Sequence, residues 1–240
     1  MPQGPGAGVS MAAIAVRSAR AALLCAVLPI VALLAACGSG RPDAGSASTP
    51  PASPSTSTPP AGCGSCQPRQ TVRLAGGAEL RLWLSANQQD YRTRPVVELL
   101  VAGRAVQSWA APRGDGWNGT LTCLDGAAPS PVPNCVLVDS AGMHASIAEL
   151  LQVQDGRLVH PPNAEVTADS PAMKATDLDQ DGYLDVIGTT NDYTPNYAQG
   201  HNYWQTFRYA DGQFVPTGCA RQAGTPTPTR LLSGSCPPQG

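Results

Sequence analysis

Residues 71–84, TVRLAGGAELRLWL, alternate apolar and polar side chains on both sides of Gly76-Gly77. A period of two is the repeat of a β-strand, because successive side chains point to opposite faces. Two glycines between two such runs indicate a tight hairpin turn. The stretch therefore predicts an antiparallel hairpin at the start of a β domain.

The same form recurs three times further along the chain. The segments are VVELLVAGRAVQSW (96–109), IAELLQVQDGRLV (147–159) and NYWQTFRYADGQFV (202–215). Their turns are Ala102-Gly103, Asp155-Gly156 and Asp211-Gly212, 53 and 56 residues apart, and a glycine in the second turn position suits a type I′ turn. This spacing favours one supersecondary unit used three times.

Further strands precede the last two hairpins, in CVLVDSAG (135–142) and YLDVIGTT (183–190). No segment has an apolar stripe of helical period longer than two turns, so the domain is predicted to be almost entirely antiparallel β. Two arrangements stay open: blade-like repeats forming part of a β-propeller, or a compact β-sandwich. Disulfides are expected to staple either one.

The N-terminus has the features of an export signal. Arg17 and Arg20 precede an apolar run over 21–36, and its 16 residues are short for a bilayer span, which needs about 20. The run ends in Leu34-Ala35-Ala36-Cys37, which resembles the lipobox of bacterial lipoproteins. The resemblance implies that residues 1–36 are removed and that Cys37 is lipidated, anchoring the chain to the extracytoplasmic face of the cell membrane. An ordinary signal peptide or a membrane helix is the alternative.

Composition changes abruptly after Cys37. Residues 38–62 are almost entirely Pro, Ser, Thr, Ala and Gly, with no aromatic or large aliphatic side chain. Such a stretch buries too little apolar surface to offset its ordering entropy, so residues 37–66 are predicted to be a disordered tether before the domain at 67–240. Without residues 1–36 the chain has 13 basic and 17 acidic side chains, a net charge of −4, which argues against nucleic-acid binding.

Six cysteines lie in or beside the domain, and an exported chain is expected to pair them in disulfides. Cys123 and Cys135 enclose a proline-rich loop between two strand-like runs, so we expect them to pair. Pairing Cys63 and Cys66 with Cys219 and Cys236 would clasp the two chain ends. A redox motif is the alternative for CGSC (63–66), but that chemistry needs a helix N-terminus.

Residues 176–185, TDLDQDGYLD, hold four aspartates within nine positions. Two carboxylates about 4 Å apart repel by roughly 4 kcal/mol at an effective dielectric near 20, and a divalent cation reverses the sign. Calcium accepts six to eight oxygen ligands in irregular geometry. The loop offers such oxygens at alternate positions, with Gly182 for the sharp turn: the side chains of Asp177, Asp179, Asp181 and Asp185 and the carbonyl of Tyr183.

An EF-hand would require a glutamate at position 12 of this loop, where Gly188 stands, and flanking helices, where strands are predicted. The pattern D-x-D-x-D-G-x-x-D followed by a strand instead resembles the calcium loops of FG-GAP and VCBS repeats, the blades of integrin-like propellers. The resemblance implies one structural Ca²⁺ held by the five residues above. A solvated acidic turn is the alternative. If the second and third units are related, the loop closed by Cys123 and Cys135 takes the place of the metal loop.

No catalytic constellation stands out. His144, His160 and His201 are scattered, and no G-x-S-x-G, H-E-x-x-H or phosphate-binding glycine loop occurs. Aromatic residues among amides after the metal loop instead suggest a ligand surface: Tyr193, Tyr197, His201, Tyr203 and Trp204. Residues 203–209 have the alternation of a strand packed inward, which is the competing interpretation.

These features predict a lipid-anchored binding or scaffolding module of the cell envelope, with a glycan or a protein as ligand. An accessory polysaccharide hydrolase or lyase, with acids outside the metal loop, is the alternative.

Overall fold

The computed structural model describes residues 58–87, 92–116, 118–125, 132–142, 144–169 and 173–238. These residues form thirteen strands in three sheets, and every strand pairing among them is antiparallel. The predicted all-β class is confirmed. The described part of the chain contains no helix with the length and hydrophobicity that a membrane span needs. Cys37, the predicted signal peptide and most of the predicted tether lie outside these residues.

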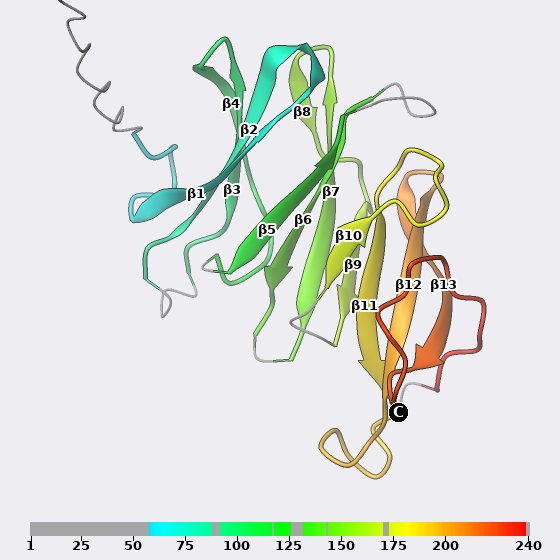
Figure 1. The fold of residues 1–240 in the computed structure, drawn as a ribbon. Coiled ribbons are helices and arrows are strands. Elements are labelled where there is room, and N and C mark those ends of the chain that lie inside the picture. Colours follow the sequence, from blue (N-terminus) through cyan, green and yellow to red (C-terminus); the bar gives the residue numbers. More distant parts are fainter. Residues whose placement is uncertain are drawn as a thin grey trace, which may run out of the picture. The chain divides into compact units, whose positions relative to one another are not determined.

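The three sheets follow one another along the chain, as the colours of Figure 1 show. The first sheet contains β1 (Cys66–Arg73), β2 (Ala78–Ser85), β3 (Val96–Val101) and β4 (Arg104–Ala110), with the short 3-10 turn η1 (Ala75–Gly77) between β1 and β2. The second contains β5 (Gly119–Leu124), β6 (Asn134–Ser140), β7 (Ser146–Gln154), β8 (Arg157–Val159) and β9 (Glu165–Ala168). The third contains β10 (Lys174–Thr176), β11 (Asp185–Asn191), β12 (Asn202–Ala210) and β13 (Gln213–Arg221).

The repeated hairpins are present where the sequence predicts them. They join β3 to β4, β7 to β8 and β12 to β13, so each sheet carries one at the same place in its strand order. Both residues of each turn have positive φ, with 50° at Ala102 and 73° at Gly103 as one example. Two successive positive φ values are the geometry of a type I′ turn, whose twist matches that of the flanking strands.

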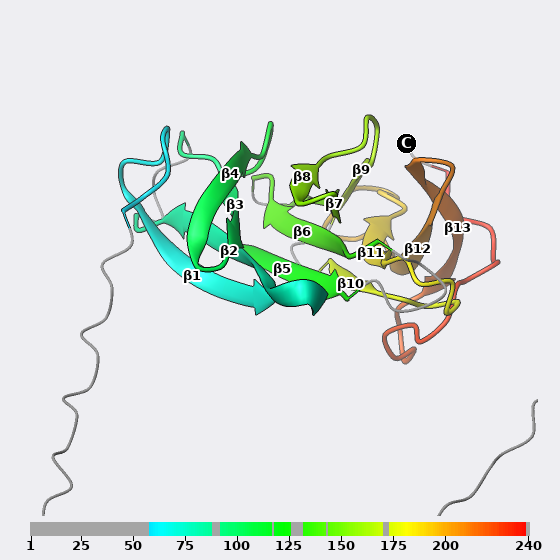
Figure 2. The ribbon, with the colours of Figure 1, turned by 90° about the horizontal axis from the view of Figure 1, so that it is seen from above.

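The second sheet packs against a neighbouring sheet on each face (Figure 2). Leu137 and Leu151 belong to a core shared with the first sheet, whereas Val136 and Leu150 belong to a core shared with the third. Neighbouring residues on one strand therefore serve opposite cores, as the period of two requires. Because both faces of β6 and β7 are covered, nearly every residue of these two strands is buried, including polar ones such as Asn134 and Glu149. The described residues form an open stack of three sheets, not a closed barrel.

Side-chain amides connect neighbouring sheets. The Gln70 amide donates to the carbonyl of Leu121 at 2.7 Å and accepts from its N–H at 3.0 Å. Gln107 makes the same pair of bonds with Leu158, at 2.7 and 2.9 Å. Leu121 and Leu158 lie on β5 and β8, and an edge strand presents unpaired backbone groups that need partners. These glutamines supply partners and hold the first sheet to the second.

The cysteines pair as Cys63–Cys66, Cys123–Cys135 and Cys219–Cys236. The expected Cys123–Cys135 bridge is confirmed, and the expected clasp between the chain ends is wrong. The reason is the open stack: the first pair belongs to the first sheet and the last pair to the third, with the second sheet between them. Three disulfides indicate an oxidising, extracytoplasmic location.

Cys63 and Cys66 lie inside the folded domain rather than in a tether. Both are buried, in a cluster with Trp83 and Val96. Cys66 begins the strand β1, so the helix N-terminus that activates a redox cysteine is not present at this motif. Nothing in this geometry favours the redox interpretation of the CGSC segment.

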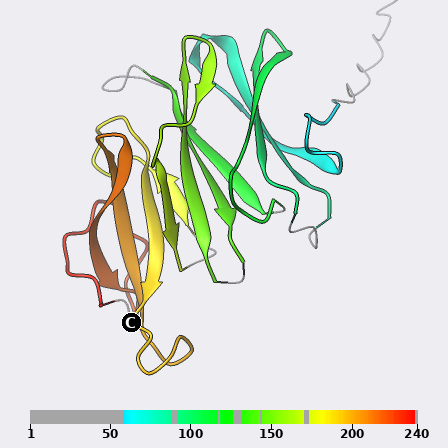
Figure 3. The ribbon, with the colours of Figure 1, turned by 180° about the vertical axis from the view of Figure 1, so that it is seen from behind.

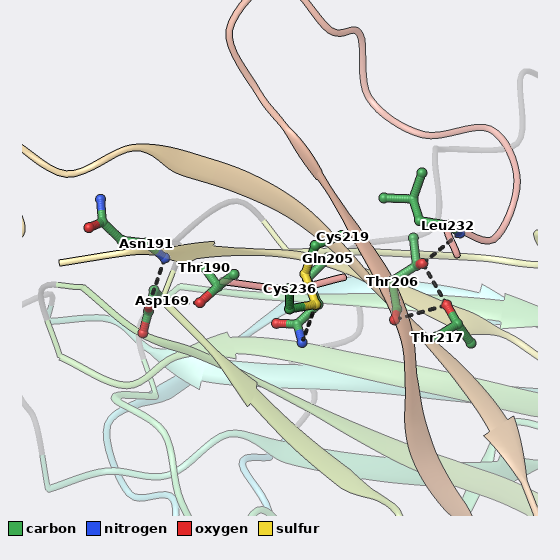
Figure 4. Close-up of a disulfide and its surroundings, with 9 residues drawn as sticks. All are labelled: Asp169, Thr190, Asn191, Gln205, Thr206, Thr217, Cys219, Leu232 and Cys236. Atoms are coloured by element: carbon green, nitrogen blue, oxygen red, sulfur yellow. Dashed lines mark hydrogen bonds between the residues drawn. A yellow bond between two sulfur atoms is a disulfide. The ribbon is translucent and has the colours of Figure 1, made fainter. Parts of the chain in front are cut away.

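The chain after β13 returns along the third sheet (Figure 3). The Thr206 hydroxyl accepts the N–H of Leu232 at 2.9 Å and lies 2.7 Å from the Thr217 hydroxyl, next to the Cys219–Cys236 disulfide (Figure 4). The N–H of Cys219 donates to Gly234. The C-terminal segment is thus bonded to β12 and β13.

Candidate functional site

The aspartate loop joins β10 to β11 and folds back on itself through its own backbone. The N–H of Gly182 donates to Asp177 Oδ2 at 3.1 Å, and the N–H of Asp181 donates to Asp179 Oδ1 at 3.2 Å. Gly182 has φ of 86°, a left-handed conformation that favours glycine. These bonds hold the carboxylates of Asp177 and Asp179 against the backbone of the loop.

Three carboxylates meet there. Asp177, Asp179 and Asp185 each offer an oxygen within 4.8 Å of the others. Asp185 is fully buried at the start of β11, where its oxygens accept the N–H groups of Leu178 at 2.8 Å and Tyr209 at 3.3 Å. Burial, together with the charges of Asp179 and Asp181, raises the pKa of Asp185 to about 7 despite these two bonds.

The donor set fits a divalent cation. Asp177 Oδ1 is buried and has no hydrogen-bond partner among the described residues. A buried carboxylate oxygen without a partner is costly, and a bound cation would supply one. The cluster of Asp177, Asp179 and Asp185 could therefore hold a metal ion. An all-oxygen donor set is the kind that Ca²⁺ and Mg²⁺ prefer.

The fourth aspartate has a different position. Asp181 is not a member of the three-carboxylate cluster; its Oδ2 lies 3.5 Å from Arg208 Nη2. Arg208 Nε also lies 3.1 Å from Asp179 Oδ2. Asp181 was predicted to be a ligand, and this arginine was not predicted. Its only signal in the sequence was a single basic residue in β12, the second strand after the acidic loop. Coordination by the Tyr183 carbonyl stays a prediction.

Asn134 fastens the loop to the second sheet. Its side chain is fully buried, donates to the carbonyl of Gly182 at 2.9 Å and accepts from the N–H of Leu184 at 3.0 Å. Asn134 immediately precedes Cys135, which pairs with Cys123 directly across β5 and β6. The disulfide loop and the metal loop both join the first two strands of their sheets, so they occupy equivalent places in the second and third sheets.

Acidic side chains also gather outside the metal loop, between the first and second sheets. Glu149 on β7 stands opposite Glu165 on β9, and Asp139 lies on the neighbouring strand β6. Burial, together with the charges of Glu165 and Asp139, raises the pKa of Glu149 to about 8. Burial also raises the pKa of Asp139 to about 6, although backbone N–H groups such as that of Gly116 oppose the rise. Glu149 and Asp139 are each only 2% exposed.

Tyr193 and Tyr197 meet a third ring that the sequence analysis did not place with them. The ring centroids of Tyr193 and Tyr197 are 5.6 Å apart, and the ring of His144 lies 4.9 Å from that of Tyr197. His144 comes from the connection between β6 and β7, so the group combines the second and third sheets. Tyr193 is 39% exposed and Tyr197 36%, and His144 is exposed too. We call these three rings the aromatic cluster.

The loop that carries the two tyrosines is held by its own polar groups. Asn191 Oδ1 accepts the N–H of Tyr193 at 2.6 Å, and Asn191 Nδ2 donates to the carbonyl of Tyr197 at 3.2 Å. Asp192 Oδ1 accepts the N–H of His201 at 2.9 Å, and Asp192 Oδ2 lies 2.8 Å from His201 Nδ1. The backbone and ring bonds from His201 lower the pKa of Asp192 to about 2. The aromatic cluster therefore stands on an ordered loop.

The remaining residues of the predicted ligand surface lie elsewhere. His201 is occupied by its hydrogen bond with Asp192 and borders a separate cavity of about 350 Å³ with Arg221. Tyr203 is half-buried on β12, and Trp204 donates from its indole nitrogen to the carbonyl of Thr225 at 3.1 Å. Further along the strand, Phe207 and Tyr209 are buried in the core between the second and third sheets, as the inward-packing interpretation predicted.

Comparison of the chain with protein-family models, with curated proteins and with solved structures finds no match.

Proposed function

We propose that the protein is a calcium-stabilised binding module of the bacterial cell envelope. The loop from Asp177 to Asp185 would hold one structural Ca²⁺, and the aromatic cluster would bind a ligand. The lipobox-like segment ending in Cys37 supports a lipid anchor in the membrane, and the three disulfides agree with an extracytoplasmic position. A calcium loop of the FG-GAP or VCBS kind stays part of the proposal.

The observation that carries the calcium assignment is the buried, unpartnered Asp177 Oδ1 beside two further carboxylates. Calcium is preferred to Mg²⁺ because Mg²⁺ demands near-ideal octahedral geometry. The loop offers carboxylates from a short, irregular turn, and Ca²⁺ tolerates that irregularity.

Calcium is expected to raise the thermal midpoint of unfolding. A ligand at 100 times its dissociation constant adds about 2.7 kcal/mol of stability. For a domain of this size that corresponds to a rise of roughly 5 to 10 °C. The measurement is differential scanning calorimetry of the disulfide-bonded protein in calcium and in chelator.

The matched pair of variants is Asp179→Ala and Asp125→Ala. Both remove one exposed carboxylate, but only Asp179 belongs to the cluster. Asp179→Ala is expected to abolish the difference between calcium and chelator, and Asp125→Ala to keep it. Identical midpoints of the wild-type protein in the two buffers would refute the calcium site.

For the ligand we propose a glycan of the envelope. Exposed aromatic rings provide stacking faces for sugar rings, and nearby amide and carboxylate groups can bond hydroxyls. Asn196 and Gln199 supply such amides on the same loop, with Asn196 Nδ2 2.6 Å from Gln199 Oε1. An ordered loop loses little entropy on binding, which favours affinity.

Replacing both Tyr193 and Tyr197 by alanine is expected to lower binding to purified cell-wall sacculi about tenfold, because each stacked ring contributes about 0.5 to 1.5 kcal/mol. Co-sedimentation of the soluble domain with sacculi measures the effect. The control is Val106→Ala, which alters an exposed apolar residue on the first sheet. Equal binding by wild type and the double variant would contradict a glycan site at the aromatic cluster, and binding only to envelope proteins would replace the glycan by a protein ligand.

The second candidate is a polysaccharide hydrolase or lyase. It is favoured by the carboxyl groups of Asp139 and Glu149, which lie outside the metal loop and have raised pKa values, as a general acid requires. Their burial keeps a polysaccharide away from both groups in this structure, so binding is the better supported function. Release of soluble reducing ends in the sacculus assay, and its loss in Glu149→Gln, would favour the enzyme instead.

A further inference from the structure

Arg208 lies where it can act on the metal loop without being a ligand. Its guanidinium contacts Asp179 Oδ2 at 3.1 Å and Asp181 Oδ2 at 3.5 Å, and its side chain is 47% exposed. The next residue on β12, Tyr209, donates its backbone N–H to Asp185 at 3.3 Å. Strand β12 therefore contacts the acidic segment at two points. The backbone N–H of Tyr209 bonds the buried carboxylate of Asp185, and the positively charged Arg208 contacts Asp179 and Asp181.

We propose that Arg208 is a built-in counter-ion that holds the metal loop in its binding conformation and lowers its affinity for the cation. The inference rests on the calcium site proposed above. Asp179 is shared, because one of its oxygens belongs to the three-carboxylate cluster while Oδ2 contacts Arg208. Asp181 is held by the same guanidinium outside that cluster. A cation in the cluster and the arginine would thus compete for Asp179, while the guanidinium keeps Asp181 away from the cluster.

The net charge of the loop sets the direction in which Arg208 changes its affinity for a cation. The four aspartates carry a formal charge of −4, which Arg208 reduces to −3. A cation entering the loop therefore meets a smaller net negative charge than it would without the arginine. The guanidinium also repels the cation, because both are positively charged. Without metal the same arginine offsets part of the repulsion among the aspartates, so the loop keeps its form before the cation arrives.

The arginine also has room to move when a cation draws Asp179 and Asp181 inward. A cavity of about 330 Å³ lies beside the ion pairs and is lined by Arg208, Asp181 and Gln152, among others. Movement into this space would separate the two positive charges while leaving the guanidinium in contact with solvent. The affinity is therefore expected to be reduced, not abolished.

The test is isothermal titration of the soluble domain with CaCl₂, using wild type, Arg208→Gln, Arg208→Lys and the control Arg104→Gln. Arg104 is exposed at the start of β4 in the first sheet, so its replacement removes the same charge on a different sheet from the metal loop. Arg208→Gln is expected to bind Ca²⁺ about tenfold more tightly at low salt, the effect of a guanidinium roughly 6 Å from a divalent ion in water. The gain should shrink in about 0.5 M NaCl, where charges are screened. Its metal-free midpoint should lie below that of wild type, and Arg104→Gln should change neither quantity.

Arg208→Lys keeps the charge but cannot bridge two carboxylates in the same way, and we expect about threefold tighter binding. If Arg208→Gln does not fold without metal, the calcium titration of Arg208→Lys replaces it as the test. Equal or weaker Ca²⁺ binding by both folded Arg208 variants would overturn this inference while leaving the calcium site intact. A wild-type protein that binds no Ca²⁺ would overturn the calcium site and this inference together.

Discussion

Replacing Glu149 by glutamine is expected to stabilise the protein by about 4 kcal/mol at pH 9 and to change its stability little at pH 5. The pKa of Glu149 is about 8 in the folded protein against an ordinary value of 4.5. Each unit of difference corresponds to about 1.4 kcal/mol between the two protonation states. The side chain is 2% exposed, and Glu149 Oε1 has no hydrogen-bond partner among the described residues.

The direction of this effect follows from proton binding. Between about pH 4.5 and 8 the unfolded chain has released the proton of Glu149 while the folded protein retains it. The folded state then binds more protons, so stability falls as pH rises through this window. Asp139, with a pKa of about 6, adds a smaller loss between about pH 4 and 6. The charges that face Glu149 are Asp139 on β6, Glu165 on β9 and Arg113 on the crossover to the second sheet.

Urea unfolding of wild type and Glu149→Gln at about pH 5, 7 and 9, with calcium held constant, measures the difference. The control is Glu79→Gln on β2, since Glu79 is only half-buried and makes an ion pair with Arg73 at the surface. We expect a control difference below about 1 kcal/mol at every pH. A Glu149→Gln advantage that does not grow with pH would show that Glu149 is already ionised in the folded protein.

The second large effect is expected at Asn134. Replacing this buried amide by leucine removes the partners of the Gly182 carbonyl and the Leu184 N–H. Each buried backbone group left without a partner costs about 1 to 3 kcal/mol, so the variant should lose roughly 2 to 5 kcal/mol of stability. Replacing a residue that bonds and orients a metal ligand commonly weakens metal binding about 10- to 100-fold. The variant should therefore also bind Ca²⁺ about 10- to 100-fold more weakly.

The matched control is Gln107→Leu, which removes an amide clamp of the same kind on an exposed part of β4. Water can replace the amide there, so the cost should stay below about 1 kcal/mol and calcium affinity should not change. Chemical unfolding and calcium titration of both variants decide the matter. Equal losses of stability at the two positions would mean that the buried bonds from Asn134 to the metal loop stabilise the protein no more than the exposed bonds of Gln107 do.

Much of the local structure is readable from residues close together in the sequence. Alternation around Ala102-Gly103 and its two counterparts predicts the hairpins, because strand period and turn geometry depend on neighbouring residues only. Strands β9 and β10 were not predicted. With four and three residues, they are too short to display a period, and their pairing partners are set by the rest of the sheet.

The candidate sites divide in the same way. The aspartate spacing alone indicates a cation loop, and the structure gathers three of its four carboxylates. The sequence could not show that Asp181 pairs with Arg208, that His144 completes the aromatic cluster, or that Glu149 is buried next to Glu165. Each of these contacts joins residues that are distant in the chain or brought together only by strand pairing.

By itself, then, the amino-acid order determined the all-β class, the repeated hairpins, the acidic loop and the Cys123–Cys135 bridge, since all of these depend on interactions within about fifteen residues. The tertiary structure alone decided the stacking of three sheets, and through it the separate disulfides at the two ends, the buried acids and the clamp on the metal loop. The physical reason is that burial and charge pairing depend on which faces pack together. Local patterns mark a face as apolar or acidic, but they do not say which partner it will meet.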